Sequence, residues 1–303
     1  MFMGTPQIAA ECLDILHKKH DVCCVVTKTD KPKGRSSALA FSDVKEKALL
    51  MGIDVVQPIT LKNGSFAHVL EKYKPDVIIV VAYGLILPKY VLDFPKYGCI
   101  NLHASLLPKY RGAAPIQWCI ANGEKTGGIT AMLMDEGLDT GDMLLKAEVE
   151  IAKDVTGGQL HDIYCKLGGQ LLLDTLDALE NGEITPQKQD DLQHTYAPML
   201  TKENTRINWN DTPQKITDLV RAMNPYPTAY TTLSGKKLKI FSCYADTSQS
   251  GESGRVISAK DNLTVACNGG AVVITELQLE GKKRMLAGDF LRGYKVNCGE
   301  MLI

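Results

Sequence analysis

The sequence lacks the patterns that mark several common classes of protein. No apolar run approaches the length of a bilayer span, and no signal-peptide pattern opens the chain. We therefore expect a cytoplasmic protein with no membrane partner. The nine cysteines are scattered and form no Cys-x-x-Cys pair. Such an odd, unpatterned set is typical of free thiols in a reducing compartment and argues against a disulfide framework or a zinc site.

Several binding and catalytic motifs are also absent. The chain has neither Gly-x-Gly-x-x-Gly nor Gly-x-x-x-x-Gly-Lys-[Ser/Thr], so the usual cradles for dinucleotides and nucleoside triphosphates are not indicated. No Ser or Cys lies in a nucleophile elbow, and no His/Cys cluster has metal-ligand spacing, so we expect no bound metal. The nucleophile of any reaction should therefore come from a substrate.

Charge is nearly balanced over the chain, with a formal net charge of −1 across 303 residues. The chain is therefore no polycation, but its charge is unevenly placed. Residues 204–303 hold 13 Lys and Arg against 9 Asp and Glu. A mildly basic C-terminal region beside an acidic remainder is a weak sign of a polyanionic partner.

Predicted strands and helices alternate over the first 184 residues. Apolar runs at 76–81 and 99–102 predict buried strands. Thr156-x-x-Gln159 is a capping box, which predicts a long helix that ends near Asn181-Gly182. This alternation is typical of an α/β protein with a Rossmann-like open, mostly parallel sheet and helices on both faces.

The pattern changes after residue 184. Residues 185–203 contain no long periodic run and are predicted to be a linker. One helix over 213–223 is followed by five short strands, hairpin signals and a terminal helix. We therefore predict an α/β domain over 1–184, the linker, and a C-terminal OB-like β-barrel domain over 204–303.

Residues 98–112 place two polar side chains at the end of a predicted strand. Asn101 and His103 are two residues apart, so they share one face of the strand and Leu102 takes the other. Ligands of open α/β sheets bind at the carboxyl ends of strands, where this pair emerges. An uncharged hydrogen-bond donor beside a titratable ring is suited to stabilise a carbonyl oxygen that becomes an oxyanion during a reaction.

Asp139 lies in a Gly-rich acidic loop that could reach the same end of the sheet. There it could hold the ring of His103 in one tautomer, as in other pairs of a base and its orienting group. Taken singly, each residue also has a structural interpretation: a turn-forming Asp, a structural His, and an Asn that satisfies backbone groups. Together they favour attack by a substrate amine on a carbonyl carbon, because an esterified α-amino group is largely neutral at cytosolic pH.

A second polar stretch, residues 28–37, holds four cations within eight residues, broken by Pro and Gly. It is predicted to be an exposed loop. One interpretation is a solvated connection, and the other is an arm that contacts nucleic-acid phosphates.

Two spaced motifs resemble the signature of the folate-dependent formyltransferases. Residues 101–108, Asn-Leu-His-Ala-Ser-Leu-Leu-Pro, are similar to the first motif, and residues 138–142, Leu-Asp-Thr-Gly-Asp, match the second. Residues 111–118 and 196–203 resemble the members of that family that formylate methionyl initiator tRNA. The likeness spans nearly the whole chain.

The resemblance implies transfer of the formyl group of 10-formyltetrahydrofolate to the amino group of methionyl initiator tRNA, by a protein that we expect to be a monomer. It implies that Asn101, His103 and Asp139 are catalytic. The folate would lie along two segments, at Ser105, Leu106, Leu107, Pro108, Val81, Tyr83, Gly84, Leu85 and Ile86. Cations of the 28–37 loop and of the barrel would contact the tRNA, namely Lys31, Lys33, Arg35, Lys236, Lys237, Lys282, Lys283 and Arg284.

Two other functions stay open on the sequence. One is a formyltransferase whose acceptor is a sugar nucleotide or another small amine. The other is an RNA-binding module that carries an idle formyltransferase-like domain.

Overall fold

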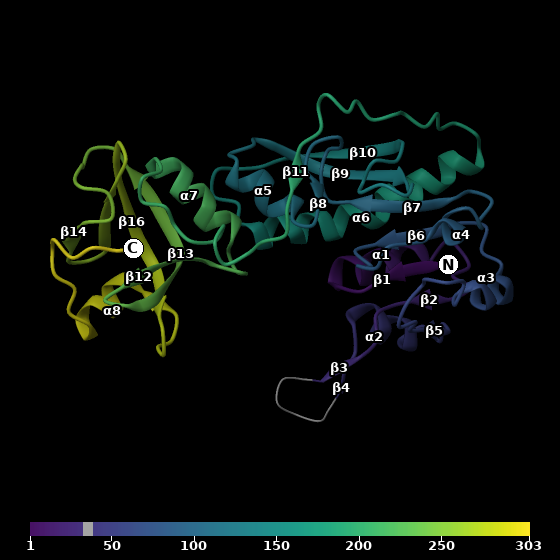
Figure 1. The fold of residues 1–303 in the computed structure, drawn as a ribbon, viewed down its shortest axis with the longest axis horizontal. Helices are drawn as coiled ribbons and strands as arrows, with labels where there is room; N and C mark the ends of the chain where they lie inside the picture. The colour runs from purple at the N-terminus through teal and green to yellow at the C-terminus, as the bar shows by residue number, and fades with distance from the viewer. Residues whose placement is uncertain (33–38) are drawn as a thin grey trace. The chain divides into compact units, whose positions relative to one another are not determined.

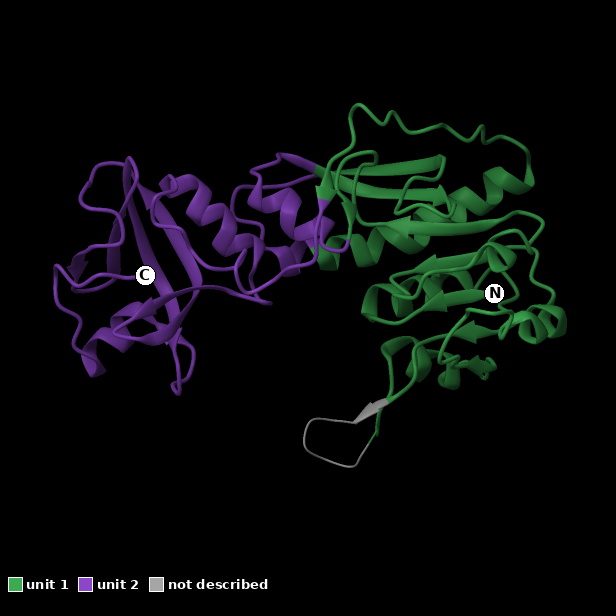
Figure 2. Cartoon of the chain, in the orientation of Figure 1, with its two compact units in different colours: residues 1–112, 127–149, 161–196 green, residues 113–126, 150–160, 197–303 purple. Residues whose placement is uncertain are grey.

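The computed structural model of the protein describes residues 1–32 and 39–303. The chain folds into two compact units, each built from three stretches of sequence (Figure 2). Unit 1 comprises Met1–Gly112, Gly127–Val149 and His161–Tyr196, and unit 2 comprises Ala113–Thr126, Glu150–Leu160 and Ala197–Ile303.

A seven-stranded sheet forms the centre of unit 1 (Figure 1). Its strands, in spatial order, are β10 (Met143–Glu150), β9 (Thr126–Leu133), β7 (Cys99–His103), β6 (Ile78–Val81), β1 (Phe2–Gly4), β2 (Val25–Val26) and β5 (Val55–Val56). The five strands from β7 to β5 run parallel, and β9 runs antiparallel to β7. The predicted open, mostly parallel sheet is therefore confirmed.

Helices follow the strands in the predicted alternation. Those whose residues lie wholly or mainly in unit 1 are α1 (Gln7–Leu16), α2 (Asp43–Leu50), α3 (Ala67–Tyr73), α4 (Lys89–Leu92) and α6 (Gly157–Glu180). The predicted capping box opens α6: the N–H of Gln159 donates to Thr156 Oγ1 at 3.2 Å, and the N–H of Thr156 donates to Gln159 Oε1 at 2.9 Å. No helix within the described ranges is both long and apolar enough to cross a membrane.

Two adjacent glycines allow α6 to pack closely in unit 1. A Cβ at Gly168 would lie 2.6 Å from Leu102 Cδ2, and one at Gly169 would lie 2.4 Å from Ile15 Cδ1. The side chain of Leu102 in β7 therefore faces α6. Because side chains alternate along a strand, Asn101 and His103 lie on the opposite face of β7.

Strand β2 pairs with each of its neighbours, β1 and β5, over only two residues. β1 offers it two partners, in the pairs Phe2↔Val25 and Met3↔Val26, so β2 is short. By contrast, β6 is buried along its whole length, as a central parallel strand covered on both faces should be.

Unit 2 contains the antiparallel sheet of the C-terminal region. Its elements are α5 (Pro115–Ala121), α7 (Pro213–Ala222), β12 (Ala229–Leu233), β13 (Lys236–Asp246), β14 (Val256–Ala259), β15 (Leu263–Cys267), β16 (Gly270–Leu279), β17 (Met285–Leu286) and α8 (Ala287–Gly293). The strand order is β12-β13-β16-β15-β14, and β17 pairs with β16. The last residues of the chain bridge both edges: Leu302 pairs with Leu233 of β12, and Met301 pairs with Arg255 beside β14. These bridges close the sheet into the predicted small barrel.

Short pairings join segments for which the sequence predicts no strand. They are β3 (Lys31–Pro32) with β4 (Leu39–Ala40), and β8 (Arg111–Gly112) with β11 (Tyr196–Ala197). Gln187 also pairs with Met143 at the start of β10. Part of the stretch predicted to be a linker is thus bonded to unit 1.

Candidate functional site

The carboxyl end of β7 carries Asn101 and His103, between β6 and β9 in the sheet. Asn101 pairs with Val80 of β6 and Met132 of β9, and His103 pairs with Thr130 of β9. Both side chains thus emerge at the edge of a parallel sheet where ligands bind. Asn101 is half-buried, and within residues 1–32 and 39–303 its amide has no hydrogen-bond partner. An amide with free donors is available to a ligand oxygen.

The imidazole of His103 is buried, with 6% of the residue exposed, and both ring nitrogens face a specific group. Nε2 lies 2.9 Å from the carbonyl oxygen of Tyr110. Because a carbonyl only accepts, Nε2 must carry the proton and donate. Nδ1 lies 3.6 Å from Asp139 Oδ2. The carboxylate therefore faces the second ring nitrogen, at a distance longer than a hydrogen bond.

Asp139 reaches His103 from a tight loop after β9. Its backbone has the left-handed φ of 54°, and its Oδ2 accepts the N–H of Gly112 at 2.8 Å. Gly141 is required two residues later, since a Cβ there would lie 1.7 Å from the carbonyl oxygen of Leu133. His103 and Asp139, which are 36 positions apart in the chain, thus face each other, and Asn101 lies two residues before His103 on the same face of β7.

The segment after His103 is held by residues that the sequence analysis did not single out. Thr130 Oγ1 donates to the carbonyl of Ser105 at 2.7 Å and accepts the N–H of Leu107 at 3.2 Å. Lys146 Nζ donates to the carbonyl of Leu107 at 2.6 Å, and burial lowers the pKa of this lysine. Each contact joins positions more than twenty residues apart, so no local pattern could predict it.

The residues predicted to contact folate differ widely in exposure. Four have buried side chains, namely Val81, Tyr83, Ser105 and Leu107. The others are partly or fully exposed, namely Gly84, Leu85, Ile86, Leu106 and Pro108. Ile86 is 86% exposed. Side-chain contact with a ligand is thus open to Leu85, Ile86, Leu106 and Pro108, whereas Gly84 and the four buried residues can offer backbone atoms.

Tyr83 is the clearest case of a predicted contact residue that packs in the core. It is 1% exposed and belongs to the apolar cluster around Phe66 and Leu70. Its hydroxyl has no hydrogen-bond partner within the described ranges. Burial raises the pKa of Tyr83 to about 12.

The barrel lysines predicted to contact RNA lie at one end of the unit 2 sheet. They flank two turns and are Lys236, Lys237, Lys282 and Lys283. β13 begins where β16 ends, because Leu238 pairs with Leu279 and the N–H of Glu280 donates to the carbonyl of Lys237 at 2.8 Å. Four cations are thus gathered by two adjacent strands.

Arg284, also predicted to contact RNA, is engaged within unit 2. Its Nε and Nη2 donate to the two carboxylate oxygens of Glu276 at 2.7 and 2.6 Å, and its guanidinium lies 4.1 Å from the ring centre of Phe241. Of the loop residues, Lys33 and Arg35 lie outside the described residues. Lys31 is described only by its backbone, in the β3–β4 pair.

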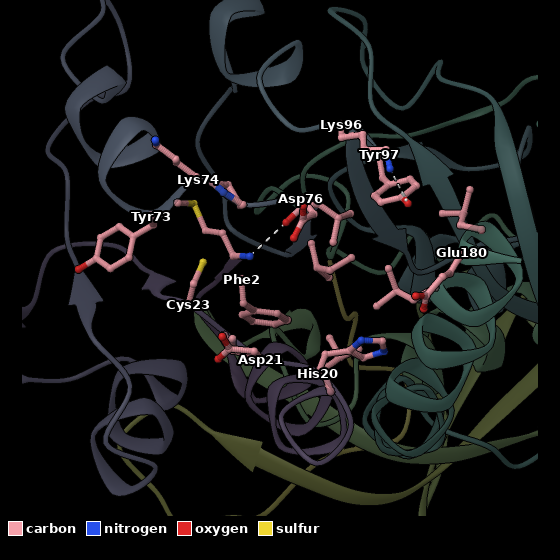
Figure 3. A pocket seen from close by; sticks show the side chains of 18 residues that line it. Phe2, His20, Asp21, Cys23, Tyr73, Lys74, Asp76, Lys96, Tyr97 and Glu180 are labelled. Carbon is pink, nitrogen blue, oxygen red and sulfur yellow. Dashed lines mark hydrogen bonds between the residues drawn. The ribbon is translucent and has the colours of Figure 1, made fainter. Parts of the chain in front are cut away.

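A cavity of about 600 Å³ lies elsewhere in unit 1 (Figure 3). Its lining includes Phe2 at the start of β1, Asp76 before β6 and Tyr97 before β7. It therefore opens at the amino ends of the parallel strands, and none of the predicted site residues lines it. In the part of the chain that the structure describes, no group of three or more His, Cys, Asp or Glu is placed to hold a metal ion.

Known proteins resemble the chain along its full length. A sequence model of the formyl transferase family matches residues 1–176, and one of the formyl transferase C-terminal domain matches residues 199–295. A methionyl-tRNA formyltransferase of Citrifermentans bemidjiense is 49% identical over 304 residues, covering 100% of this chain and 95% of its own. One of Clostridium acetobutylicum is 48% identical over 305 residues, covering 100% and 98%.

The fold also has solved relatives. The structure of a methionyl-tRNA formyltransferase from Clostridium thermocellum superposes with a TM-score of 0.56 at 16% identity, covering 92% of this chain and 96% of that one. At that identity the likeness speaks for the fold alone. The full-length identities and the two matched family models decide the assignment: the chain belongs to the formyl transferase family, among the methionyl-tRNA formyltransferases.

Proposed function

We propose that the protein transfers the formyl group of 10-formyltetrahydrofolate to the α-amino group of methionine esterified to initiator tRNA. The observation that carries the proposal is the meeting of His103 and Asp139, 3.6 Å apart, beside Asn101 at the carboxyl end of β7. This arrangement occurs in a chain that aligns from end to end with proteins named for that reaction.

The reaction forms one C–N bond and breaks another. The neutral amine of the aminoacyl ester attacks the formyl carbon, and the formyl oxygen gains negative charge. Asn101 has an amide without a protein partner in the described residues, so it donates to that oxygen. One well-aimed donor to an oxyanion is worth about 3–4 kcal/mol of transition-state stabilisation.

A proton must then pass from the attacking nitrogen to the departing folate nitrogen. Nε2 of His103 is occupied by the carbonyl of Tyr110, so Nδ1 is the nitrogen left to face the reacting atoms. Asp139 lies beside Nδ1 and keeps the ring in that orientation. A placed acid or base contributes about 100-fold or more to the rate. His103 therefore assists both the oxyanion and the proton transfer, and Asp139 supports it.

The remaining contacts follow from exposure and charge. The partly exposed side chains of Leu106, Pro108 and Ile86 offer apolar surface to the donor near the same end of the sheet. The lysines gathered at the end of β13 and β16 offer cations to tRNA phosphates. We expect the protein to act as a monomer in the cytoplasm, where charged tRNA is found.

A formylation assay with charged initiator and charged elongator tRNA in parallel tests the proposal. With 10-formyltetrahydrofolate as donor, formyl groups should appear on methionyl initiator tRNA and only slowly on the elongator species. An enzyme that formylates a sugar nucleotide or a small amine but neither tRNA would overturn the proposed acceptor. Absence of folate binding in equilibrium dialysis would instead indicate an idle domain.

A further inference from the structure

The stretch predicted to be a linker makes specific contacts with the Asp139 loop. The side-chain amide of Gln189 donates one hydrogen bond to the carbonyl of Asp139 and another to the carbonyl of Gly141, each at 2.8 Å. The carbonyl oxygen of the same side chain accepts Arg111 Nε at 3.0 Å. All of these residues belong to unit 1.

The orientation of the Gln189 amide follows from its partners. An Arg guanidinium can only donate and a backbone carbonyl can only accept, so Oε1 must face Arg111 and Nε2 must face the loop. Arg111 is itself fixed, since it is 2% exposed and its Nη2 donates to Asp191 Oδ1 at 2.9 Å. Both amide hydrogens of Gln189 are therefore used on one short loop.

This bridge begins at the residue that carries the carboxylate. Gln189 joins the carbonyls on either side of Thr140, in a turn where Asp139 has a φ of 54°. Asp tolerates a left-handed backbone better than most residues, and the two hydrogen bonds from Gln189 hold the turn in this one conformation. The same backbone aims Asp139 Oδ2 at both His103 Nδ1 and the N–H of Gly112.

The same stretch also holds the other partner of the imidazole. Thr195 Oγ1 accepts the N–H of Tyr110 at 2.9 Å, and the carbonyl of Thr195 accepts the N–H of Arg111 at 2.8 Å. The carbonyl of Tyr110 is the group that accepts the hydrogen bond from His103 Nε2. One segment, residues 189–195, thus fixes the backbone opposite each ring nitrogen.

We propose that Gln189, oriented by Arg111, is a positioning residue for formyl transfer. It holds the Asp139 loop in the conformation that presents the carboxylate to His103. The proposal rests on the proposed function, because the reaction it serves is the one assigned to His103 and Asp139.

Gln189→Glu is the sharpest test, since it keeps the shape and an oxygen for Arg111 but removes both hydrogens donated to the loop. We expect kcat for formylation to fall at least ~10-fold, because small displacements of a catalytic group cost one to two orders of magnitude. KM for the donor and for tRNA should stay within about twofold, which is the pattern of an interaction realised in the transition state.

Gln187→Glu is the matched control. It adds the same charge two residues earlier, at an exposed side chain with no hydrogen bond to any described residue, and the strand pairing of Gln187 uses only its backbone. It should leave kcat and both KM values at the wild-type level. A loss of rate equal to that of Gln189→Glu would assign the effect to charge and overturn the proposal.

Amide hydrogen exchange tests the positioning without relying on activity. The N–H of Gly112 is protected by Asp139 Oδ2. Release of the loop by Gln189→Glu should speed its exchange at least ~10-fold, while Gln187→Glu should not. Unchanged exchange at Gly112, or a Gln189→Glu enzyme that turns over at the wild-type rate or loses activity only through KM, would overturn the proposal. Failure of the wild-type enzyme to formylate tRNA would instead overturn the proposed function, and the exchange measurement would still decide the role of Gln189.

Discussion

At the scale of single residues, the environment of His103 decides what the ring can do. Nε2 donates to a backbone carbonyl and is unavailable to a substrate, so the chemistry falls to Nδ1, which faces Asp139. Asn101, two residues earlier on the same face of β7, carries an amide that does not titrate, so it can donate a hydrogen bond at any pH. Asn101 can therefore serve the oxyanion alone, whereas His103 serves both the oxyanion and the proton transfer.

The sequence predicts these three residues but not what holds them. The spacing of Asn101 and His103 places both on one face of a strand, and a Gly-rich acidic loop marks Asp139. Gln189 and Thr195, which hold the backbone around these residues, lie 48 or more positions from the groups they bond. No local period or turn signal encodes such contacts, so they emerge only from the fold.

Tyr83 gives a prediction about stability and pH. Tyr83→Phe removes a buried hydroxyl that has no partner in the described residues, so the free energy of unfolding should rise by about 1 kcal/mol at pH 7. Burial raises the pKa of Tyr83 from 10.0 to about 12, so above pH 10 the unfolded chain releases this proton more readily than the folded one, and the wild type loses stability as the pH rises toward 12. The stability advantage of the Tyr83→Phe variant over the wild type should therefore widen above pH 10.

Urea unfolding of both proteins between pH 7 and 11 measures this effect. The donor KM should not change, because the hydroxyl lies in the core. A less stable variant, or one with a raised donor KM, would mean that the hydroxyl has a hydrogen-bond partner in solution.

At the scale of elements, α6 is the helix whose start and end the sequence predicts best. The capping box opens it, the predicted end at Asn181-Gly182 follows its last residue Glu180, and both hydrogen bonds of the box are present. Short elements are harder to predict because their existence depends on a partner. β8 and β11 are two residues each and exist only through their mutual pairing.

Thr156→Ala tests how much the cap contributes. Loss of the hydroxyl leaves the N–H of Gln159 without its partner, so the free energy of unfolding should fall by about 1 kcal/mol. Thr156→Ser keeps the hydroxyl and should stay within a few tenths of a kcal/mol of the wild type. Denaturant midpoints of the three proteins give the comparison, and equal midpoints for Ala and Thr would show that water replaces the cap.

At the scale of the whole molecule, the alternation of strands and helices predicts the parallel sheet, and the later run of short strands predicts the barrel. The closure of that barrel by Met301 and Leu302 could not be predicted, because isolated bridges leave no pattern in the sequence. The domain limits of 184 and 204 stay a prediction. The two compact units interleave along the chain, and such interleaving cannot be read from composition.

The charge distribution gives a prediction about tRNA binding. Replacing the four lysines at the end of β13 and β16 with Gln should raise KM for tRNA and leave kcat within about twofold, since phosphate contacts position the substrate. The slope of log KM against log salt should flatten by about one for each lysine that no longer neutralises a phosphate. Lys260→Gln, at an exposed position after β14, is the control and should change neither value. A quadruple variant with an unaltered salt slope would remove the lysines from the RNA-binding surface.

The most direct test of the account is the single-turnover rate of formyl transfer by Asn101→Ala, with enzyme in excess over methionyl initiator tRNA and the formyl donor saturating. Loss of the oxyanion donor predicts a rate about 100- to 1,000-fold below that of the wild type, with folate binding nearly unchanged in equilibrium dialysis. A single-turnover rate close to that of the wild type would contradict it.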